Sequence, residues 1–347
     1  MKTTAAVLVQ TGRPLEIADL DVPTLQPGQA LVQVRYSGVC HTQLLECRGH
    51  RGRDPFLPHC LGHEGVGIVC EVGRGINRVK PGDTVILSWI KASGSDVPAT
   101  QYQWDGRTVN AGGVTTFARL AVVSENRLTP IESSLCTPAG AMLGCALPTG
   151  MGAVIHTANA RPGQRIVIFG LGGVGLCAVL GAALAGCHPI IAVDIQPSKF
   201  DAARKLGATH FVNADPENLL EQLHQLCPEG VDLAIEATGQ PTVMAMALRC
   251  VRPRGGAAVV IGNARQNQSL SIDPGQLNLG KKLLGTWGGD TMPDRDYPRY
   301  ARMLTDRRID LSPLVNTTYP LEATNEALDA LERGRSIRPI IDMSLTN

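Results

Sequence analysis

Hydrophobic and polar positions alternate in short segments over the first third of the chain, from about residue 3 to residue 123. Gly and Pro interrupt these segments, and Pro27-Gly28 and Pro81-Gly82-Asp83 have the composition of turns. This pattern predicts a β-rich domain with long loops. The clearest predicted strands are Ala5–Val9, Ala30–Tyr36, Val66–Val72 and Thr84–Ser88.

The pattern changes near Pro148 to apolar runs that alternate with helical segments. A buried strand at Arg165–Phe169 leads into a glycine-rich turn and an apolar helix that ends at Ala185, with Gly186 as its cap. Five or six strands alternating with helices predict a doubly wound parallel sheet. The further predicted elements are strands at Pro189–Val193, His210–Val212, Val231–Glu236 and Ala257–Ile261 and helices at Ser198–Leu206, near Pro216–Cys227 and near Pro241–Cys250.

The alternation stops after about Trp287. Helices at Tyr297–Thr305 and Leu321–Arg333 and a last strand near Pro339–Met343 are predicted there. We expect this tail to rejoin the N-terminal domain. Residues 92–113, by contrast, are polar and poor in large aliphatic side chains, which predicts a surface lobe.

Length and charge limit the possible functions. At 347 residues the chain exceeds what one hydrophobic core usually serves, so two domains are expected. Its 32 Lys and Arg residues nearly balance 31 Asp and Glu residues. No global field therefore favours nucleic acid or an anionic membrane, and neither is expected as a partner.

The stretch Ile166–Val193 lacks charged residues and is long enough to raise the question of a membrane span. Six glycines interrupt it, and Arg165 and Asp194 bound it, which favours a nucleotide-binding fold. The first ten residues turn polar too soon for a signal peptide. Together with ten cysteines in a long chain, this indicates reduced thiols and a cytoplasmic location.

The segment Gly170-Leu171-Gly172-Gly173-Val174-Gly175 matches the pattern G-x-G-x-x-G between a predicted strand and a predicted helix. Gly170, Gly172, Gly173 and Gly175 allow a tight turn and close approach of a pyrophosphate, whose charge the helix N-terminus attracts. Asp194 follows at the end of the next strand, where a carboxylate binds ribose hydroxyls and repels a 2′-phosphate. It predicts NAD rather than NADP, and Lys199 lies beside the same ribose or is a solvated helix lysine.

A metal site is predicted from Cys40, His63 and Cys145. Catalytic zinc needs three protein ligands and one open position, and two cysteines with one histidine form one established set. Cys145 lies at the junction of the two predicted domains, so the metal would lie beside the nicotinamide. Four other residues near the main motif could form a structural site, although their spacing is poor for one. They are Cys47, His50, His59 and Cys60.

With these residues in view, the chain resembles the zinc-dependent alcohol dehydrogenases of the medium-chain dehydrogenase/reductase superfamily over essentially its whole length. The resemblance implies an α/β fold in which a Rossmann domain, residues 148–287, is inserted in a β-rich GroES-like catalytic domain, residues 1–147 with a return at 288–347. It also implies reversible, NAD-dependent oxidation of an alcohol, and dimers or tetramers. The matching stretches are Gly38–Thr42, Gly62–Gly67, Pro81–Val85, Cys145–Gly152, Phe169–Gly175, Val193–Phe200 and Ser336–Arg338.

The resemblance also assigns roles to individual residues. Cys40, His63 and Cys145 are similar to the zinc ligands, and Glu64 to a carboxylate that approaches the metal transiently. Thr42 resembles the hydroxyl that starts the proton relay. The remaining roles implied are nicotinamide contacts for Thr149 and Val174, pyrophosphate contacts for His41 and Arg338, and a wall of the substrate pocket, or simply a core position, for Trp89.

Three positions depart from the family pattern. Many relatives hold a second, structural zinc with four cysteines near residues 92–113, but this chain has no cysteine between Cys70 and Cys136, so one zinc per chain is expected. Gln43 stands where an aspartate usually supports the zinc-bound histidine, so Gln43→Asp should strengthen zinc retention. Leu45 replaces a relay histidine, which leaves ribose hydroxyls and water, Glu46 or His50 as proton exits.

Three rival functions stay open at this stage. A polyol or sugar-alcohol dehydrogenase of the same superfamily fits the polar lobe, although Cys145 stands where polyol enzymes often have a glutamate. A non-catalytic nucleotide-binding protein conflicts with the complete metal triad. A zinc-free quinone reductase would share the fold but lack the ligands. The substrate itself is not predicted.

Overall fold

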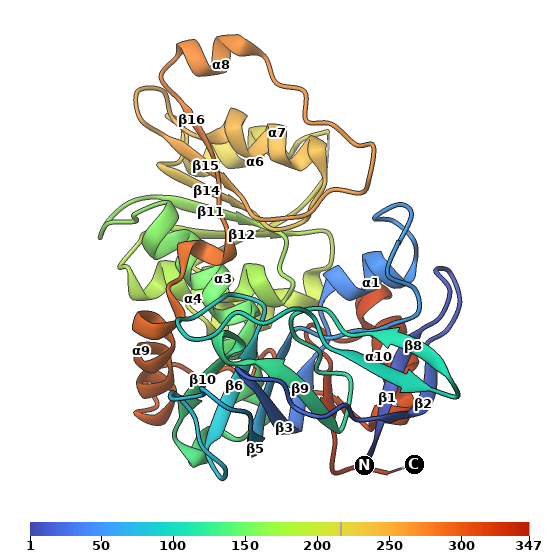
Figure 1. The fold of residues 1–347 in the computed structure, drawn as a ribbon. Helices are drawn as coiled ribbons and strands as arrows, with labels where there is room; N and C mark the ends of the chain where they lie inside the picture. The colour runs from blue at the N-terminus through green and yellow to red at the C-terminus, as the bar shows by residue number, and fades with distance from the viewer. Residues whose placement is uncertain (216, 347) are drawn as a thin grey trace. The chain divides into compact units, whose positions relative to one another are not determined.

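The computed structural model describes residues 1–215 and 217–346 and forms two compact units (Figure 1). The first unit comprises residues 1–145 and 292–347, and the second comprises residues 146–291. The C-terminal tail thus folds with the N-terminal part of the chain. Pro216, at which one helix was predicted to begin, lies outside the described residues.

The first unit is rich in β-structure. One set of strands closes a barrel in the order β1 (Lys2–Leu8), β2 (Glu16–Asp21), β7 (Gln101–Trp104), β8 (Arg107–Asn110) and β4 (His59–Cys60). A second sheet has the order β10 (Leu128–Ile131), β6 (Thr84–Ser88), β5 (Glu64–Val72), β3 (Gln29–Gly38), β18 (Ile340–Asp342) and β17 (Thr318–Tyr319), and β9 (Leu120–Ser124) also pairs with β3.

Strand β3 links the beginning of the chain to its end. It pairs antiparallel with β5 and with β18, where Ile340 lies opposite Gly38. The side chains that these strands turn inward, such as Val32, Val34 and Ile341, are fully buried. The four helices of this unit are α1 (His41–Cys47), α2 (Pro138–Ala141), α9 (Pro293–Thr305) and α10 (Thr324–Glu332).

The predicted polar lobe contains the hairpin of β7 and β8, and this hairpin belongs to the barrel. Its side chains alternate: Gln101 and Gln103 are exposed, whereas Tyr102 and Val109 are buried. The Tyr102 hydroxyl accepts a hydrogen bond from the Val122 backbone N–H at 2.8 Å. The hairpin is therefore held by a hydrophobic core and by backbone pairing rather than by a cluster of cysteines.

The second unit is a doubly wound α/β domain, which confirms the predicted fold class. Its six strands are parallel, and the strands β11, β12 and β14 consist of buried residues throughout, as is typical of a sheet covered by helices on both faces. The strand order is β13 (His210–Asn213), β12 (Ile190–Asp194), β11 (Ile166–Phe169), β14 (Leu233–Glu236), β15 (Ala257–Val260) and β16 (Lys282–Gly285).

Four helices of the second unit, α4 to α7, are close to those predicted, whereas α3 and α8 were not predicted. Helix α5 begins at Phe200, two residues later than predicted, because Pro197–Lys199 forms a separate 3₁₀ turn. Gly186 lies just beyond α4 with φ +73°, the left-handed conformation expected of a helix-terminating glycine. The helices are α3 (Ala146–Gly152), α4 (Gly173–Leu184), α5 (Phe200–Lys205), α6 (Leu219–Leu226), α7 (Pro241–Cys250) and α8 (Pro274–Asn278).

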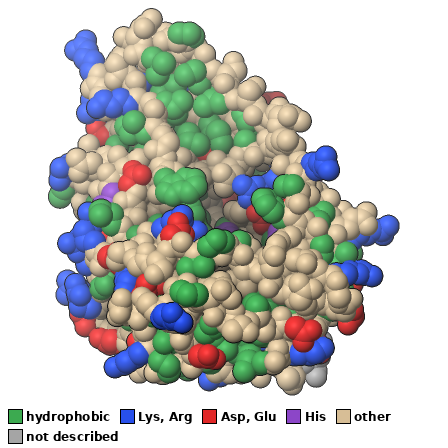
Figure 2. All heavy atoms as spheres, in the orientation of Figure 1, with side chains coloured by type: hydrophobic (Ala, Val, Ile, Leu, Met, Phe, Trp, Pro, Cys, Tyr) green, Lys and Arg blue, Asp and Glu red, His purple; other side chains and the backbone are tan. Residues whose placement is uncertain are grey.

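Within the described residues, no single helix is long and apolar enough to cross a membrane. The consecutive helical stretches Pro138–Gly144 and Ala146–Thr157 meet the length and composition criteria only when they are taken together. On the face drawn in Figure 2, Lys and Arg side chains are interspersed with Asp and Glu side chains.

Candidate metal centre and dinucleotide site

The candidate metal-binding residues come from three segments of the first unit. Cys40 is the residue before helix α1, His63 immediately precedes strand β5, and Cys145 follows a 3₁₀ turn near residue 144. One atom from each, two Sγ and one imidazole nitrogen, lies within 4.8 Å of the others. Among the described residues, no other group of His, Cys, Asp and Glu side chains was found that could hold a metal.

Glycines bring these segments together. A Cβ on Gly38 would lie 2.3 Å from Glu64 Oε1, and one on Gly144 would lie 2.4 Å from the Leu87 carbonyl oxygen. Real Cβ atoms do not come this close to other atoms: at Gly144 the obstacle is backbone, and at Gly38 it is the Glu64 carboxylate, which Arg338 holds in place. Gly62 has φ +92°, which turns the chain immediately before His63.

The site fits zinc. Ligand atoms placed 2.0–2.3 Å from a tetrahedral zinc lie about 3.5–3.8 Å apart, and the three atoms here are close enough to reach that arrangement. Cys40 and Cys145 are only 7% and 6% exposed. Three ligands from Cys, His and Cys leave one position open, which is typical of a catalytic rather than a structural zinc.

The two thiols titrate differently. The Cys145 thiol forms a hydrogen bond with Cys40 that holds the pKa of Cys40 well below its usual value, and the Arg338 guanidinium also lowers it. The same bond, together with burial, raises the pKa of Cys145 well above the usual value. One thiolate is therefore favoured before a metal binds, and binding must displace the proton of the other.

Gln43 is the partner of His63, as its position predicted. Its side-chain nitrogen contacts His63 Nδ1, and its Oε1 accepts a hydrogen bond from the Cys40 backbone N–H at 2.8 Å. Gln43 is also the third residue of helix α1, so the bond to Cys40 caps the helix. Thr42, the predicted proton acceptor, is half-buried, and its Oγ1 is 3.8 Å from Cys40 Sγ.

Glu64 and Arg338 form a buried ion pair. Both side chains are almost fully buried, and the guanidinium binds both carboxylate oxygens, with Arg338 Nε 3.2 Å from Glu64 Oε1. Burial raises the pKa of Glu64, against the lowering effect of Arg338. In this structure Arg338 therefore holds Glu64. The contact of Arg338 with a pyrophosphate and the approach of Glu64 to the metal stay predictions.

Trp89 and His41 lie on either side of His63 in the sequence. The Trp89 ring makes an edge contact with the His63 ring, with centroids 6.5 Å apart, and its backbone N–H donates to the His63 carbonyl at 3.2 Å. This contact fits both the pocket-wall and the core interpretation. His41 is exposed at the first position of α1.

The alternative metal site is not formed. His59 Nε2 is 2.8 Å from Asp54 Oδ2, and His59 Nδ1 faces the Cys60 carbonyl. Burial raises the pKa of the Cys47 thiol and of the Cys60 thiol to about 12 each, so neither is prepared to become a thiolate. Of the two predicted proton exits on side chains, Glu46 is paired with Arg51 at 2.7 Å.

The glycine-rich turn in the second unit has the expected shape. Gly170 has φ +87°, and a Cβ on Gly175 would lie 1.8 Å from the Gly170 carbonyl oxygen, so both positions require glycine. A Cβ on Gly172 would meet no protein atom within 4 Å. Internal packing therefore does not require glycine at Gly172, and the open space before helix α4 fits a bound pyrophosphate.

Asp194 fixes the same turn. Its Oδ2 accepts a hydrogen bond from the Leu171 backbone N–H at 2.7 Å, its Oδ1 accepts one from Gln196 N–H at 2.9 Å, and Lys199 Nζ lies 3.2 Å from Oδ2. The carboxylate is thus held rigidly at the end of β12. Lys199 is paired with Asp194 rather than solvated alone.

Two residues of helices α3 and α4 were predicted to contact the nicotinamide. The Thr149 hydroxyl is buried and has no hydrogen-bond partner among the described residues, as expected of a group that waits for a ligand. Val174 is the second residue of α4, and its carbonyl would lie 2.2 Å from a Cβ on Gly150. Helices α3 and α4 therefore pack through small residues at this point.

Sequence reasoning missed Glu236, the last residue of β14. Its Oε1 accepts hydrogen bonds from the backbone N–H groups of Thr238 at 2.6 Å and Gly239 at 2.9 Å, and burial raises its pKa. The Thr238 side chain packs against Gly170 and leaves no room for a Cβ there, which would lie only 2.7 Å from it. Glu236 thus orders the loop beside the glycine-rich turn. The sequence signal that could have indicated this role is a carboxylate at the end of a buried strand, followed by Thr238 and Gly239.

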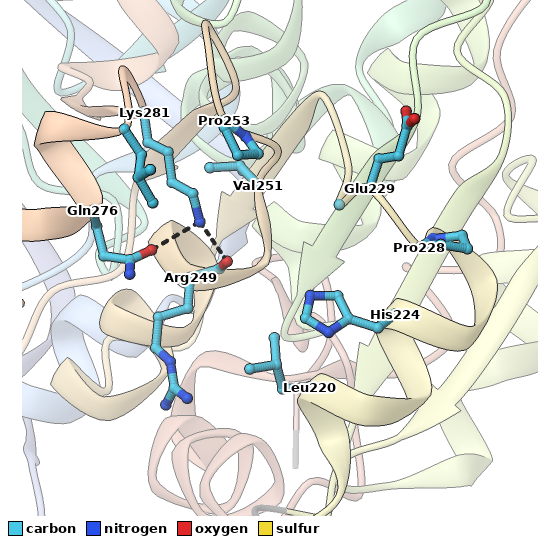
Figure 3. Close-up of a pocket in the computed structure, with 11 residues that line it drawn as sticks. Leu220, His224, Pro228, Glu229, Arg249, Val251, Pro253, Gln276 and Lys281 are labelled. Atoms are coloured by element: carbon cyan, nitrogen blue, oxygen red, sulfur yellow. Dashed lines mark hydrogen bonds between the residues drawn. The ribbon is translucent and has the colours of Figure 1, made fainter.

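A hollow of about 610 Å³ lies elsewhere on the second unit, at the amino ends of strands β14–β16 (Figure 3). Ligands of doubly wound sheets bind at the opposite, carboxyl ends. Lys281 points into the hollow, but its ammonium group donates to the Leu248 and Arg249 carbonyls and to Gln276 Oε1. These three bonds use all its protons, so it closes the end of α7 rather than offering a donor.

Comparison with known proteins identifies the family. Residues 26–133 match the alcohol dehydrogenase GroES-like domain, and residues 173–306 match the zinc-binding dehydrogenase domain. The chain is 36% identical to S-(hydroxymethyl)glutathione dehydrogenase of Synechocystis sp. over 98% of its own length and 100% of the relative's. The chain belongs to the zinc-dependent alcohol dehydrogenase family of the medium-chain dehydrogenase/reductase superfamily.

Solved structures agree with this assignment. Benzyl alcohol dehydrogenase from Acinetobacter calcoaceticus has a TM-score of 0.89 and 28% identity over 99% of both chains. A zinc-binding domain alcohol dehydrogenase from Burkholderia ambifaria has a TM-score of 0.91 and 29% identity over 99% of both chains. As an alcohol dehydrogenase, the protein is an oxidoreductase that reversibly oxidises an alcohol with a nicotinamide cofactor, as the family resemblance predicted.

Proposed function

We propose that this alcohol dehydrogenase uses one catalytic zinc, held by Cys40, His63 and Cys145, and NAD as its hydride acceptor. The observation that carries the proposal is the approach of three ligand atoms, from three distant segments of one compact unit, to within 4.8 Å of one another. We assign the catalytic domain to residues 1–147 and 288–347 and the dinucleotide domain to residues 148–287.

Zinc at this site would supply a Lewis acid that lowers the pKa of a substrate hydroxyl. Thr42 Oγ1, close to Cys40 Sγ, receives the hydroxyl proton and starts its transfer to solvent. The buried walls around Cys40 and Cys145 exclude water from the open position. Glu64 is bound to Arg338 and would be the nearby carboxylate able to approach the metal.

Asp194 supports NAD rather than NADP. Its carboxylate is fixed at the end of β12 by Leu171 N–H, where it would repel a 2′-phosphate. The turn Gly170–Gly175 and the N-terminus of α4 receive the pyrophosphate, with His41 and Arg338 as further contacts. Thr149 and Val174 contact the nicotinamide, and the partnerless Thr149 hydroxyl supports that role.

The hairpin β7–β8 supports a single metal in each chain. It occupies the segment in which many relatives hold a structural zinc, and its buried Tyr102 and Val109 replace metal ligands as the source of order. We propose one zinc per chain. A homo-oligomer, dimer or tetramer, and a cytoplasmic location, in which the ten cysteines stay reduced, complete the proposal.

The test is metal analysis combined with NADH formation across an alcohol panel. We expect one zinc per chain and NAD reduction by at least one alcohol class among simple primary alcohols, benzyl alcohol and S-(hydroxymethyl)glutathione. Cys145→Ala should lose both zinc and NAD reduction. Two zinc ions per chain would contradict the single site, activity on polyols alone would favour the polyol interpretation, and equal activity with and without zinc would favour the quinone reductase.

A further inference from the structure

The end of strand β6 is bonded to both segments that carry the later metal ligands. The Trp89 backbone N–H donates to the His63 carbonyl at 3.2 Å. The Ser88 hydroxyl donates to the Gly144 carbonyl at 2.7 Å, in the peptide immediately before Cys145. Ser88, the last residue of β6, and Trp89, which follows it, therefore join the Cys145 segment to the His63 segment.

The Ser88 hydroxyl has all its hydrogen-bonding capacity in use. Its single proton goes to the Gly144 carbonyl, which can only accept. The Ile90 backbone N–H at 3.0 Å and the Tyr297 hydroxyl at 2.7 Å then both donate to Ser88 Oγ. Tyr297 is fully buried on helix α9, more than 200 residues away in sequence. The orientation of the Ser88 hydroxyl is thus set from two sides.

The Cys145 segment cannot move toward β6 to compensate for a lost bond. A Cβ on Gly144 would lie 2.4 Å from the Leu87 carbonyl oxygen and 3.0 Å from Glu64 Cα. The backbone at Gly144 is already in contact with β5 and β6. Only movement away from the strands is open to it, and that movement would carry Cys145 away from His63.

We infer that Ser88 and Tyr297 are positioning residues that fix the third zinc ligand, Cys145, at the distance that the metal requires. The inference rests on the metal centre of the proposed function. Neither residue touches the metal. Ser88 acts through the Gly144 peptide, whose carbonyl it holds, and Tyr297 acts through Ser88. Outer partners of metal ligands typically change metal affinity by about 10- to 100-fold when they are removed.

The test measures zinc affinity by competition with a chromophoric chelator for the wild type, Ser88→Ala and Tyr297→Phe. Ser88→Ala removes the bond to the Gly144 carbonyl, so we expect zinc binding to weaken about 10-fold or more. Tyr297→Phe removes one donor to Ser88 and should weaken it several-fold. Tyr102→Phe is the matched control, because it removes the hydroxyl of another buried tyrosine, one that accepts a hydrogen bond from Val122 N–H in the barrel.

Cobalt substitution supplies a second readout. The thiolate-to-cobalt absorption band reports on both cysteine ligands, and we expect it to shift or weaken in Ser88→Ala and Tyr297→Phe and to be unchanged in Tyr102→Phe. If Ser88→Ala does not fold, Tyr297→Phe alone decides the question. Zinc affinity and a cobalt band equal to those of the Tyr102→Phe control would overturn the inference. A wild-type protein without a zinc site would overturn the proposed metal centre and, with it, this inference.

Discussion

Replacing Gln43 with glutamate should make the protein bind zinc more tightly. Cys40 N–H can only donate, so the Gln43 oxygen must face it, at 2.8 Å, and the Gln43 NH₂ group must face His63 Nδ1. His63 Nδ1 is then an acceptor, and the proton of the neutral ring lies on Nε2. A histidine that binds a metal through Nε2 must carry its proton on Nδ1 instead.

Metal binding therefore gives Gln43 two donors, Cys40 N–H and His63 Nδ1–H, for a single acceptor oxygen. Gln43 and Cys40 are buried, and a buried donor left without a partner costs about 1–3 kcal/mol. Glutamate has the same length and two acceptor oxygens, so it can serve both donors. The difference corresponds to zinc binding that is about 10- to 100-fold tighter in Gln43→Glu.

The assay is chelator competition on the wild type and on Gln43→Glu, with Gln29→Glu as the control. Gln29 is also buried in the first unit, but it bonds to Gln26 N–H and Thr100, so the control adds the same charge away from the metal. Nitrogen NMR of the metal-free proteins should show His63 protonated on Nε2 in the wild type and on Nδ1 in the variant. Zinc affinity in Gln43→Glu no higher than in wild type would refute the reasoning.

Three further predictions concern the two sites and the packing between ligands. Cys40→Ala should abolish zinc binding and NADH formation while NAD still binds, as measured by fluorescence; retained turnover would contradict the metal assignment. Asp194→Ser removes the acceptor for Leu171 N–H and the charge that repels a phosphate. The KM for NAD should therefore rise, and the preference for NAD over NADP should fall about 10-fold or more. An unchanged ratio of kcat/KM for NAD to kcat/KM for NADP would contradict this prediction. Gly144→Ala places a Cβ 2.4 Å from the Leu87 carbonyl and should destabilise the protein by about 1–3 kcal/mol, visible as a lower Tm; an unchanged Tm would show that the backbone there can move.

Local signals in the sequence were sufficient for the parallel sheet and for the glycine-rich turn. Strand β6 was predicted with the bounds that the structure has, since its five residues are all buried and apolar runs mark such strands well. The hairpin β7–β8 was predicted only as a polar lobe. Its strands have four residues each, too few for the alternation of Tyr102 with exposed glutamines to stand out.

The site was predictable where residue type alone restricts the chemistry. Cys40, His63 and Cys145 could be selected as ligands because few side chains bind zinc. The pairing of Arg338 with Glu64 could not be predicted, because 274 residues separate them and either charge could have been paired elsewhere. The bond between Tyr297 and Ser88 has the same origin, since it forms only when helix α9 packs against β10, the strand that pairs with β6, in the folded first unit.

Because the lobe formed by the hairpin β7–β8 is held by a hydrophobic core, its folding does not depend on zinc. Relatives that hold this lobe with four thiolates risk its unfolding whenever an oxidant attacks the thiols or zinc is scarce. Here Tyr102 and Val109 offer no thiol to oxidise and no thiolate to bind zinc. Oxidation of Cys40 or Cys145 by peroxide would therefore silence the enzyme without unfolding the lobe. Such an inactive protein stays available for repair by a reductant and one zinc ion.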